Sequence, residues 1–219
     1  MKILSPLQED FIKAFAKSKL AKNIFLTGGT ALSAFYLFHR FSEDMDFFTE
    51  LEGEIPQSVP ILKDIARELN GRIEIRKEFT TFVEVFFSRK DEKVKIHFAQ
   101  DTPFRLRKIN WDKTYNILID NLLDIACNKI SALFDRSAEK DFVDIYFLSK
   151  EFMPFEKIYK FARKKHIGMD EYWLAASLKN VEKIEKLPRM IKPVTIKELR
   201  EFYYEKIKML MARIKQKGK

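Results

Sequence analysis

The sequence has little cysteine and no long apolar run, and each shortage excludes a class of protein. Cys127 is the single cysteine among 219 residues, so an internal disulfide framework and a multi-cysteine metal cluster are both excluded. No stretch approaches the roughly 18 uncharged apolar residues of a membrane span, and the start, MKILSPLQEDF, lacks the apolar core of a secretion signal. We therefore expect a cytoplasmic protein with no membrane partner.

Charge is distributed unevenly along the chain. Residues 150–219 contain 19 Lys and Arg against 9 Asp and Glu, whereas residues 1–149 contain 22 against 23. A basic block beside a neutral one favours a polyanion partner such as nucleic acid. A Lys/Glu-rich thermophile surface would explain the amount of charge but not its one-sided placement. We expect the densest cluster, Arg163, Lys164 and Lys165, to contact an RNA backbone.

Apolar periodicity predicts strands mixed with helices first, and helices alone afterwards. Ser5, Pro6 and Gln8 have the pattern of a capping box at the start of a helix. Further helices are expected at residues 30–40 and 60–69 and throughout the chain from about residue 121. Strands are expected at residues 23–27, 45–48, 72–79, 81–88 and 93–99.

These elements predict an α+β protein with two domains. Residues 1–115 would form a domain with a mixed β-sheet flanked by helices, and residues 116–219 a helical domain with a basic surface. The boundary lies where the strand pattern gives way to the helical one, at about residues 110–120.

A glycine pair separates the first expected strand from the helix after it. Gly28 and Gly29 have no Cβ, so the chain can turn tightly there and bring the amide groups at the start of the helix close to a phosphate. Glycines after a strand more often form a simple turn. The pair predicts a phosphate cradle only in combination with the charged residues further along the chain.

Two aspartates alternate on the next expected strand. Asp44 and Asp46 project from one face, while Met45 and Phe47 point to the core. Like charges so close together repel unless a cation lies between them, and Mg²⁺ binds through one or two carboxylates plus substrate phosphates. A solvated strand face has the same spacing. The fixed order of glycine turn, Arg40 and aspartates favours a metal–nucleotide complex, with Arg40 offsetting negative charge.

Two ordered motifs resemble those of the AbiEii-type nucleotidyltransferase toxins, which belong to the polymerase-beta-like nucleotidyltransferase superfamily and include the MenT toxins. The first motif contains Gly28, Gly29, Thr30, Ala31, Leu32, Arg40, Ser42, Asp44 and Asp46. The second is the stretch NLLDIACNKISALFDRSAEKDFVDIYFL, which contains Lys129, Arg136, Asp141 and Asp144. The basic C-terminal helices resemble the family only in being helical.

The resemblance implies an enzyme that transfers a nucleoside monophosphate from an NTP to an acceptor and releases pyrophosphate. In MenT-like members the acceptor is the 3′ end of tRNA. Asp44 and Asp46 would hold Mg²⁺ or Mn²⁺ and, with Lys129 and Asp141, would form the catalytic set. The implied nucleotide-binding residues are Gly28, Gly29, Thr30, Arg40, Ser42, Lys129 and Arg136.

The resemblance also implies roles for the second motif. Lys129 would meet the triphosphate and Arg136 would add a bidentate contact. Asp141 would orient one of them or act on the acceptor hydroxyl, whereas Asp144 is expected to anchor its helix. The helical domain would thereby complete the nucleotide cleft.

The chain departs from the superfamily pattern at a third carboxylate. That group commonly lies on a strand beside the two aspartates, and the matching strand carries His97. A neutral imidazole adds no negative charge, so a two-metal site would hold Mg²⁺ less tightly. The sequence leaves open whether His97, Glu84 or Asp101 takes the role. Lys140 also replaces the usual arginine before Asp141, which keeps the charge but loses bidentate geometry.

Three functions remain compatible with these residues. The leading one is a toxin-like nucleotidyltransferase that acts on RNA, with tRNA as the expected acceptor and a cognate antitoxin as a further expected partner. The second uses the same site for nucleotidylation of, or phosphoryl transfer to, a protein. The third is a degenerate protein that binds nucleotide or RNA without chemistry, and His97 is its motivation. The basic last third favours RNA as the acceptor.

Overall fold

The structure is a computed structural model that describes residues 3–217 and divides the chain into two compact units. The first unit comprises the chain up to Tyr36 together with Phe41–Asn121, and the second comprises Leu37–Arg40 and the chain from Leu122 on. The α+β prediction is confirmed, because a mixed sheet with flanking helices forms in the first unit and helices build the second.

The first unit is built on a seven-stranded sheet. In sheet order the strands are β3 (Arg72–Phe79), β4 (Phe82–Arg89), β5 (Glu92–Gln100), β2 (Met45–Thr49), β1 (Phe25–Thr27), β7 (Ile117–Ile119) and β6 (Asn110–Asp112). Strand β1 is parallel to β7 and β2 is parallel to β5, while the other neighbours are antiparallel. The β6–β7 hairpin lies in a segment where the apolar pattern predicts no strand.

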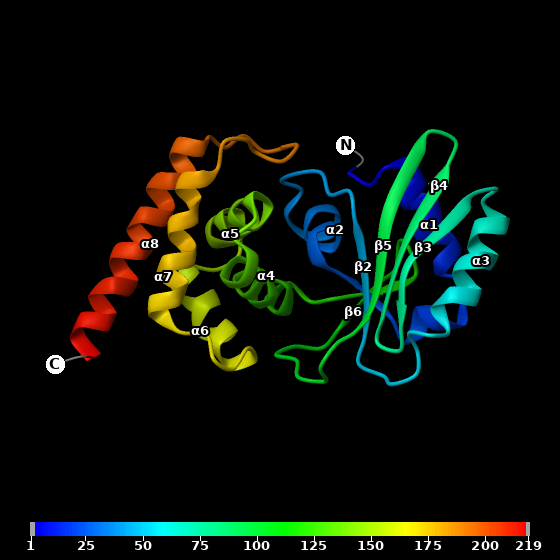
Figure 1. The fold of residues 1–219 in the computed structure, drawn as a ribbon, viewed down its shortest axis with the longest axis horizontal. Helices are drawn as coiled ribbons and strands as arrows, with labels where there is room; N and C mark the ends of the chain where they lie inside the picture. The colour runs from blue at the N-terminus through cyan, green and yellow to red at the C-terminus, as the bar shows by residue number, and fades with distance from the viewer. Residues whose placement is uncertain (1–2, 218–219) are drawn as a thin grey trace. The chain divides into compact units, whose positions relative to one another are not determined.

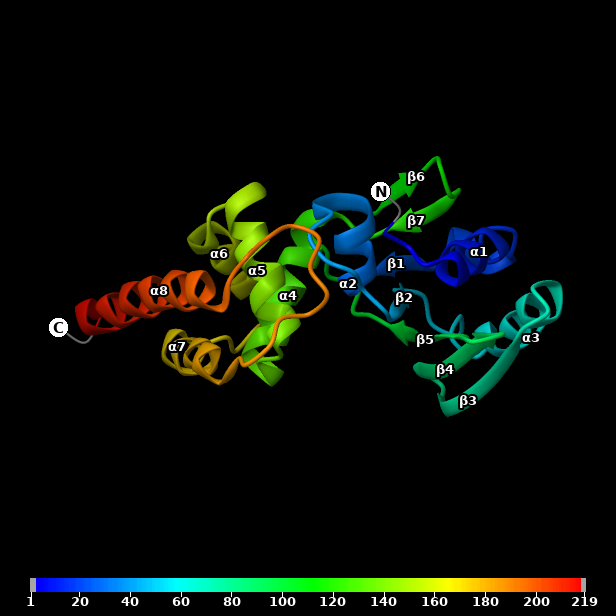
Figure 2. The ribbon, with the colours of Figure 1, turned by 90° about the horizontal axis from the view of Figure 1, so that it is seen from above.

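One face of this sheet is closed by aromatic side chains. Helices α1 (Pro6–Phe15) and α3 (Ser58–Glu68) lie together on that face (Figures 1 and 2). The ring of Phe15 on α1 packs against Phe47 of β2 at 4.7 Å between centroids, and Phe47 stacks on Phe98 of β5 at 5.1 Å. Because side chains alternate along a strand, the neighbours of Phe47 and Phe98 project from the opposite face.

The helix expected after the glycine pair is short and changes type. Helix α2 (Gly28–Ala31) continues as a π-helix over Leu32–Leu37, and Phe38 then takes a positive φ of 53°. A short 3₁₀ segment, Lys19–Lys22, precedes β1. Helix α2 lies on the side of the sheet away from α1 and α3 (Figures 1 and 2), so it faces the polar side chains of β2.

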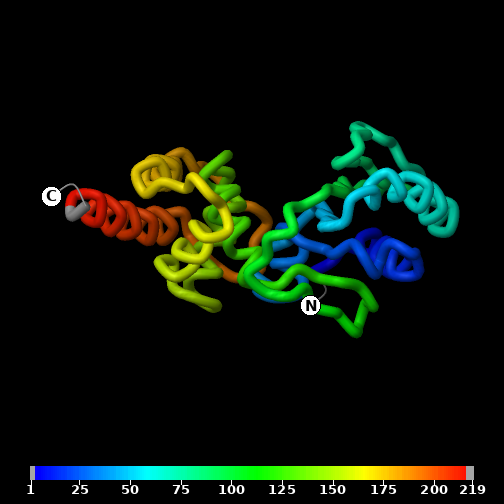
Figure 3. The backbone as a smooth tube through the Cα atoms, turned by 90° about the horizontal axis from the view of Figure 1, so that it is seen from below, coloured from blue at the N-terminus to red at the C-terminus, as the bar shows by residue number. Residues whose placement is uncertain are grey.

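The second unit is a group of helices arranged around α4. Helix α4 (Leu122–Arg136) contacts α5 (Glu139–Glu151), α6 (Phe155–Lys165) and α7 (Glu171–Lys179), and a 3₁₀ segment (Asn180–Lys183) follows α7. The last helix, α8 (Ile196–Lys217), packs along α7, as Figures 1 and 3 show. No helix within residues 3–217 is both long and apolar enough to span a bilayer.

Residues 37–40 belong to the second unit although they lie between two segments of the first. The carbonyl of His39 accepts hydrogen bonds from the amides of Ile191 and Lys192 at 2.9 and 3.0 Å. Arg40 forms an isolated antiparallel bridge with Met190. The segment that leads to α8 therefore holds residues 37–40 by backbone pairing.

Candidate active site

The glycine turn fits directly against the aspartate strand. Gly28 has a φ of +69°, and a Cβ placed on it would lie 2.1 Å from Oδ2 of Asp46. The hydroxyl of Thr30 donates a hydrogen bond to the backbone carbonyl of Asp44. Glycine is required at position 28 both by the backbone conformation and by the carboxylate that occupies the space of a side chain.

A row of polar side chains crosses the open face of the sheet. Asp46 of β2 is in register with Thr27 of β1 and with His97 of β5, which is in register with Glu84 of β4. Nδ1 of His97 lies 2.9 Å from Oδ1 of Asp46, and Nε2 lies 3.0 Å from Oε2 of Glu84. Ionised carboxylates only accept hydrogen bonds, so an imidazole bonded to both donates from both nitrogens and carries a positive charge.

This row changes the electrostatics expected from the sequence. The hydrogen bond to Asp46 raises the pKa of His97, and burial only partly opposes it. Burial would raise the pKa of Glu84, but the hydrogen bond from His97 and the positive charges of Lys77, His97 and Lys95 together lower that pKa. Lys95 lies 3.5 Å from Asp44. Each of the two aspartates therefore has a cationic side chain beside it, which reduces their mutual repulsion.

The two aspartates have the chemistry of a divalent metal site. Their side chains remain 29% and 26% exposed for Asp44 and Asp46, and carboxylate oxygens are the donors that Mg²⁺ prefers. In the part of the chain that the structure describes, no three His, Cys, Asp or Glu side chains are grouped as a metal site. A metal held by Asp44 and Asp46 would thus complete its coordination with phosphate oxygens and water.

The three candidates for the third carboxylate role lie in different places. His97 occupies the register position beside Asp46, and Glu84 lies beyond it on the next strand. Asp101 follows the end of β5, where its carboxylate accepts from the amide of Thr102 at 2.9 Å. The group next to Asp46 is therefore a cation.

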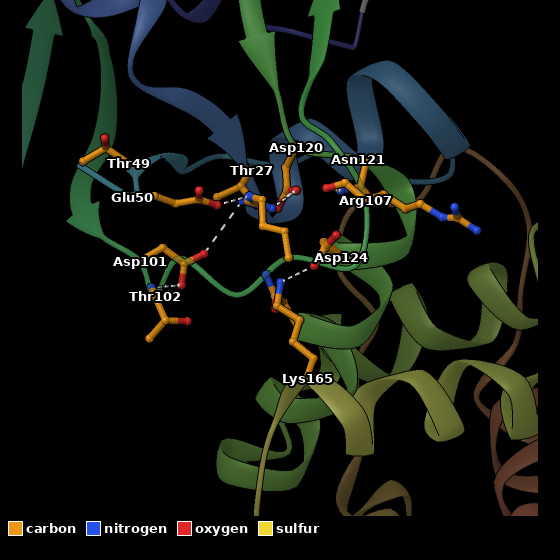
Figure 4. A network of polar contacts seen from close by, with 12 residues as sticks. Thr27, Thr49, Glu50, Asp101, Thr102, Arg107, Asp120, Asn121, Asp124 and Lys165 are labelled. Carbon is orange, nitrogen blue, oxygen red and sulfur yellow. Dashed lines mark hydrogen bonds and ion pairs between the residues drawn. The ribbon is translucent and has the colours of Figure 1, made fainter.

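A buried carboxylate that the sequence did not single out binds Thr27, the residue before the glycine turn (Figure 4). Asp120, directly after β7, accepts a hydrogen bond from the hydroxyl of Thr27 at 2.8 Å and from Nη1 of Arg105 at 2.7 Å. The guanidinium of Arg105 lies 4.2 Å from the ring centroid of Phe25 and also pairs with Glu50. Asp120 therefore fixes the residue that precedes Gly28. The signal in the sequence is an apolar run, ILI, that ends in an aspartate.

In the second unit, Asp144 is a buried ionic hub. Its carboxylate is bonded to Nε2 of His39 at 2.7 Å, to Nε and Nη2 of Arg40 at 2.6 and 2.9 Å, and to Nζ of Lys129 at 2.7 Å. Burial alone would raise its pKa, but Lys129, Arg40 and His39 together hold the pKa well below the ordinary value. Burial lowers the pKa of His39, and Asp144 only partly offsets that effect.

Asp141 holds two of the other residues of the second motif. Its carboxylate accepts from Nε and Nη2 of Arg136 at 2.8 and 2.9 Å and lies 3.5 Å from Nζ of Lys129. The side chain of Arg136 is otherwise exposed, whereas that of Lys129 is nearly buried. Asp141 thus orients both cations within the second unit.

The residues assigned from the sequence consequently form two groups. Asp46 meets the glycine turn and His97 in the first unit, and the carbonyl of Ser42 there accepts from Nε2 of Gln8 at 2.9 Å. The second group contains Arg40, Lys129, Arg136, Asp141 and Asp144. The nucleotide-binding and catalytic roles of both groups stay predictions.

One expectation for the basic last third is wrong. Lys165 does not present its charge to solvent, because its side chain is only 3% exposed and Nζ lies 2.6 Å from the buried carboxylate of Asp124 (Figure 4). His166 is also bonded to Asn128 at 3.2 Å. The end of α6 is therefore fixed to α4, and of the three-residue cluster only Arg163 and Lys164 remain exposed.

The sequence is similar to those of known proteins. A family model described as "Nucleotidyl transferase AbiEii toxin, Type IV TA system" matches residues 10–216. An uncharacterized protein of Aquifex aeolicus (strain VF5) is 27% identical over 210 residues, which cover 95% of this chain and 98% of that protein.

Two crystal structures from Helicobacter pylori are similar in fold. One is described as a candidate nucleotidyltransferase and superposes with a TM-score of 0.64 at 19% identity, covering 97% of this chain and 98% of its own. The other, JHP933, gives a TM-score of 0.60 at 19% identity, covering 97% of this chain and 92% of its own.

Replacing Gly28 by alanine tests the fit between the turn and the aspartate strand. Gly28→Ala should abolish Mg²⁺-dependent NTP binding in calorimetric titration, because its Cβ would displace the Asp46 carboxylate. Gly53→Ala is the matched control: Gly53 has a φ of +78° but no atom within 4 Å of its Cβ position. Both variants should lose about 1–2 kcal/mol of stability to the left-handed backbone. Equal NTP affinities in the two variants would contradict the fit.

Replacing Asp144 by asparagine tests the ionic hub. Asp144→Asn removes the carboxylate that the buried side chains of Arg40 and Lys129 share, so urea denaturation at pH 7 should show a loss of about 3–5 kcal/mol. Since the pKa of Asp144 is depressed in the folded state, this contribution is present above the unfolded-state pKa of about 4 and is lost as the pH falls below it. The difference between the two proteins should therefore shrink in acid.

The control for that experiment is Asp64→Asn on α3. Asp64 is also paired with an arginine, Arg67, but both side chains are exposed, so the expected loss is below about 1 kcal/mol. A loss for Asp144→Asn no larger than that of Asp64→Asn would show that the hub does not stabilise the fold.

Proposed function

The chain belongs to the AbiEii nucleotidyltransferase toxin family, and we propose on that basis that it transfers a nucleoside monophosphate from an NTP to an RNA acceptor, the 3′ end of tRNA. It is a nucleotidyltransferase by membership of the family. The acceptor, the metal and the roles of single residues are the content of the proposal.

One observation carries the proposal, namely the contact between Gly28 and Asp46. The space of a side chain at position 28 is filled by the Asp46 carboxylate, so the turn lies against one of the two carboxylates that we propose as metal ligands. A phosphate against the turn amides would be within reach of a cation held by Asp44 and Asp46. A simple turn would not require this contact.

In the proposed reaction an acceptor hydroxyl oxygen forms a bond to the α-phosphorus, the bond from that phosphorus to the pyrophosphate oxygen breaks so that pyrophosphate leaves, and the hydroxyl proton passes to water. A divalent ion, when bound, supplies charge stabilisation to the attacking and leaving oxygens. Asp44 and Asp46 bind that ion, and the amides after Gly28 bind phosphate. Protonated His97 holds the Asp46 carboxylate in place through Nδ1.

The assignments in the second unit stay predictions. Lys129 and Arg136 are proposed to meet the triphosphate and Asp141 to orient them, in agreement with the bonds that Asp141 makes to both. Arg40 and Lys129 already bind Asp144, so their contribution to nucleotide binding would add to a structural one. A cognate antitoxin is a further proposed partner, on the ground that the family is described as part of type IV toxin–antitoxin systems.

His97 is also the reason to retain a second candidate function. A positive side chain beside Asp46 occupies the place where the superfamily commonly has a third carboxylate, and it weakens the attraction for a second cation. That observation favours a protein that binds nucleotide and RNA but does not transfer the nucleotide to the RNA.

Labelled nucleotides distinguish these functions. The protein should incorporate label from α-labelled but not γ-labelled NTP into tRNA, and Asp44→Ala or Asp46→Ala should abolish incorporation because each removes a metal-binding carboxylate. Glu43→Ala removes an exposed neighbouring carboxylate and serves as the control. Stabilities should stay within about 1 kcal/mol of the parent, since all three side chains are at least partly exposed.

The other outcomes identify the alternatives. Incorporation of either label into protein in place of tRNA would establish a protein acceptor. Nucleotide binding with no incorporation anywhere would establish the degenerate protein. Near-normal transfer by Asp44→Ala or Asp46→Ala would show that the metal assignment is wrong.

A further inference from the structure

A basic cavity lies in the second unit where α6, α7 and α8 meet. It has a volume of about 550 Å³, and five basic side chains line it: Lys157, Lys160, Arg163, Lys164 and Arg213. Four of them come from α6, at spacings that place them on adjacent turns. We call these five residues and the cavity they line the basic hollow.

The acidic residues of the basic hollow are already paired. Glu156 lies 3.2 Å from Lys206, and Glu171 lies 3.6 Å from Arg163. Burial would raise the pKa of Glu156, but its backbone hydrogen bond and Lys206 lower it, so this carboxylate is ionised and satisfied. Within residues 3–217, Lys157, Lys160 and Arg213 have no ion-pair partner. The basic hollow thus has a surplus of positive charge.

A buried hydroxyl in the wall of the basic hollow also lacks a partner. Tyr159 lines the cavity and its side chain is almost wholly buried, yet no hydrogen bond reaches its hydroxyl from the described residues. Burial raises the pKa of Tyr159 to about 12, so the hydroxyl keeps its proton. Buried polar groups are normally hydrogen-bonded, and an acceptor oxygen brought by a ligand would satisfy this donor.

Two large aromatic rings are exposed in the first turn of α7, next in sequence to Glu171 of the cavity wall. Helix α7 begins with Glu171, which lines the cavity, and continues with Tyr172 and Trp173. These two side chains are 53% and 62% exposed and meet edge to face at 5.3 Å. Neighbouring exposed apolar side chains are more typical of an interaction site than single ones are. Figures 1 and 3 show α7 beside α8, which carries Arg213.

We propose that the basic hollow and the Tyr172–Trp173 pair bind a single-stranded segment of RNA. Backbone phosphates lie against Lys157, Lys160 and Arg213, and an unpaired base stacks on the exposed rings. The proposal rests on the proposed function, because it assigns the grip on an RNA acceptor. Single-stranded RNA is the ligand whose chemistry matches both halves: closely spaced phosphates for the cations, and bases with a free face for the rings.

A charge-reversal pair tests the phosphate contacts. The double variant Lys160→Glu with Arg213→Glu reverses two charges of the basic hollow, one on α6 and one on α8. The control, Lys197→Glu with Lys208→Glu, reverses the same number of charges. At about 100° per residue, these two lysines lie on the face of α8 opposite to Arg213. Binding of a fluorescein-labelled single-stranded oligoribonucleotide to the full chain is measured by anisotropy over a salt series. The first pair should weaken binding at least about tenfold and reduce the salt slope by about 0.7 per lost phosphate contact. The control pair should do neither.

A second pair of variants isolates the base. Tyr172→Ala with Trp173→Ala should weaken binding at least about fivefold, but should make no difference for an oligonucleotide of equal length that lacks its bases. The charge-reversal pair should weaken binding of both strands. Tyr159→Phe should keep or raise the melting temperature, since it removes a buried hydroxyl that has no partner in the described residues, and should weaken RNA binding.

The results separate failure of this proposal from failure of the proposed function. If the parent labels tRNA and both variant pairs bind and label it equally well, the RNA grip lies elsewhere while the transfer function stands. Equal losses in the charge-reversal and control pairs would reduce the effect to net charge and overturn the proposal. Absence of single-stranded RNA binding by the parent would also overturn it, whereas tight binding without transfer would overturn only the proposed function.

Discussion

The second unit depends on the ionic contacts that the buried carboxylate of Asp144 makes. This carboxylate binds three residues from two separate parts of the sequence, the neighbours His39 and Arg40 and, on α4, Lys129, and Arg40 and Lys129 are cations. Removing charges from water is costly, and their attraction offsets that cost only where hydrogen bonds satisfy each of them. Residues 37–40 thereby stay in the second unit although the chain on both sides belongs to the first. Arg40, Lys129 and Asp144, which belong to the two sequence motifs, are therefore also one structural network.

In the first unit, side chains alternate between the two faces of β2, so that one face packs in the core and the other carries the polar groups of the candidate site. Phe47 of β2 stacks in the aromatic core, while Asp46, one residue earlier, projects to the opposite face and bonds to His97. Because the period is two residues, a shift of register by one would bury the carboxylate and expose the ring. The phenylalanines of α1 and β5 therefore fix the position of Asp46 as firmly as its own hydrogen bond does. The glycine turn can approach the carboxylate closely only because the core holds the strand in that register.

The sequence predicts the features that depend on local or periodic signals. The capping box of Ser5 and Gln8 forms as expected, and the alternating strands and the α+β class are confirmed. The β6–β7 hairpin is missed because its strands are three residues each, too short for alternation to show. The π-helical turn after Ala31 is missed because it keeps the apolar content of a regular helix. The contacts that place Asp120 behind the glycine turn join residues far apart in sequence, where no spacing rule applies.

The basic residues in the last third of the chain are a second case in which contacts between distant residues escape prediction from the sequence. The number of basic residues indicates a polyanion partner. From the sequence alone, the densest run, Arg163, Lys164 and Lys165, is the first candidate for contact with it. In the fold, Lys165 of that run is paired with Asp124, and Lys192 and Lys206 are likewise paired with Glu151 and Glu156. Cations that are neutralised inside the protein do little for a ligand, because their field is already screened by a neighbour. Lys157, Lys160 and Arg213 instead line one cavity with residues of three helices, among them Tyr159, whose buried hydroxyl has no hydrogen-bond partner in the described residues. It is this convergence of cations in space, and not their density along the chain, that identifies a binding surface.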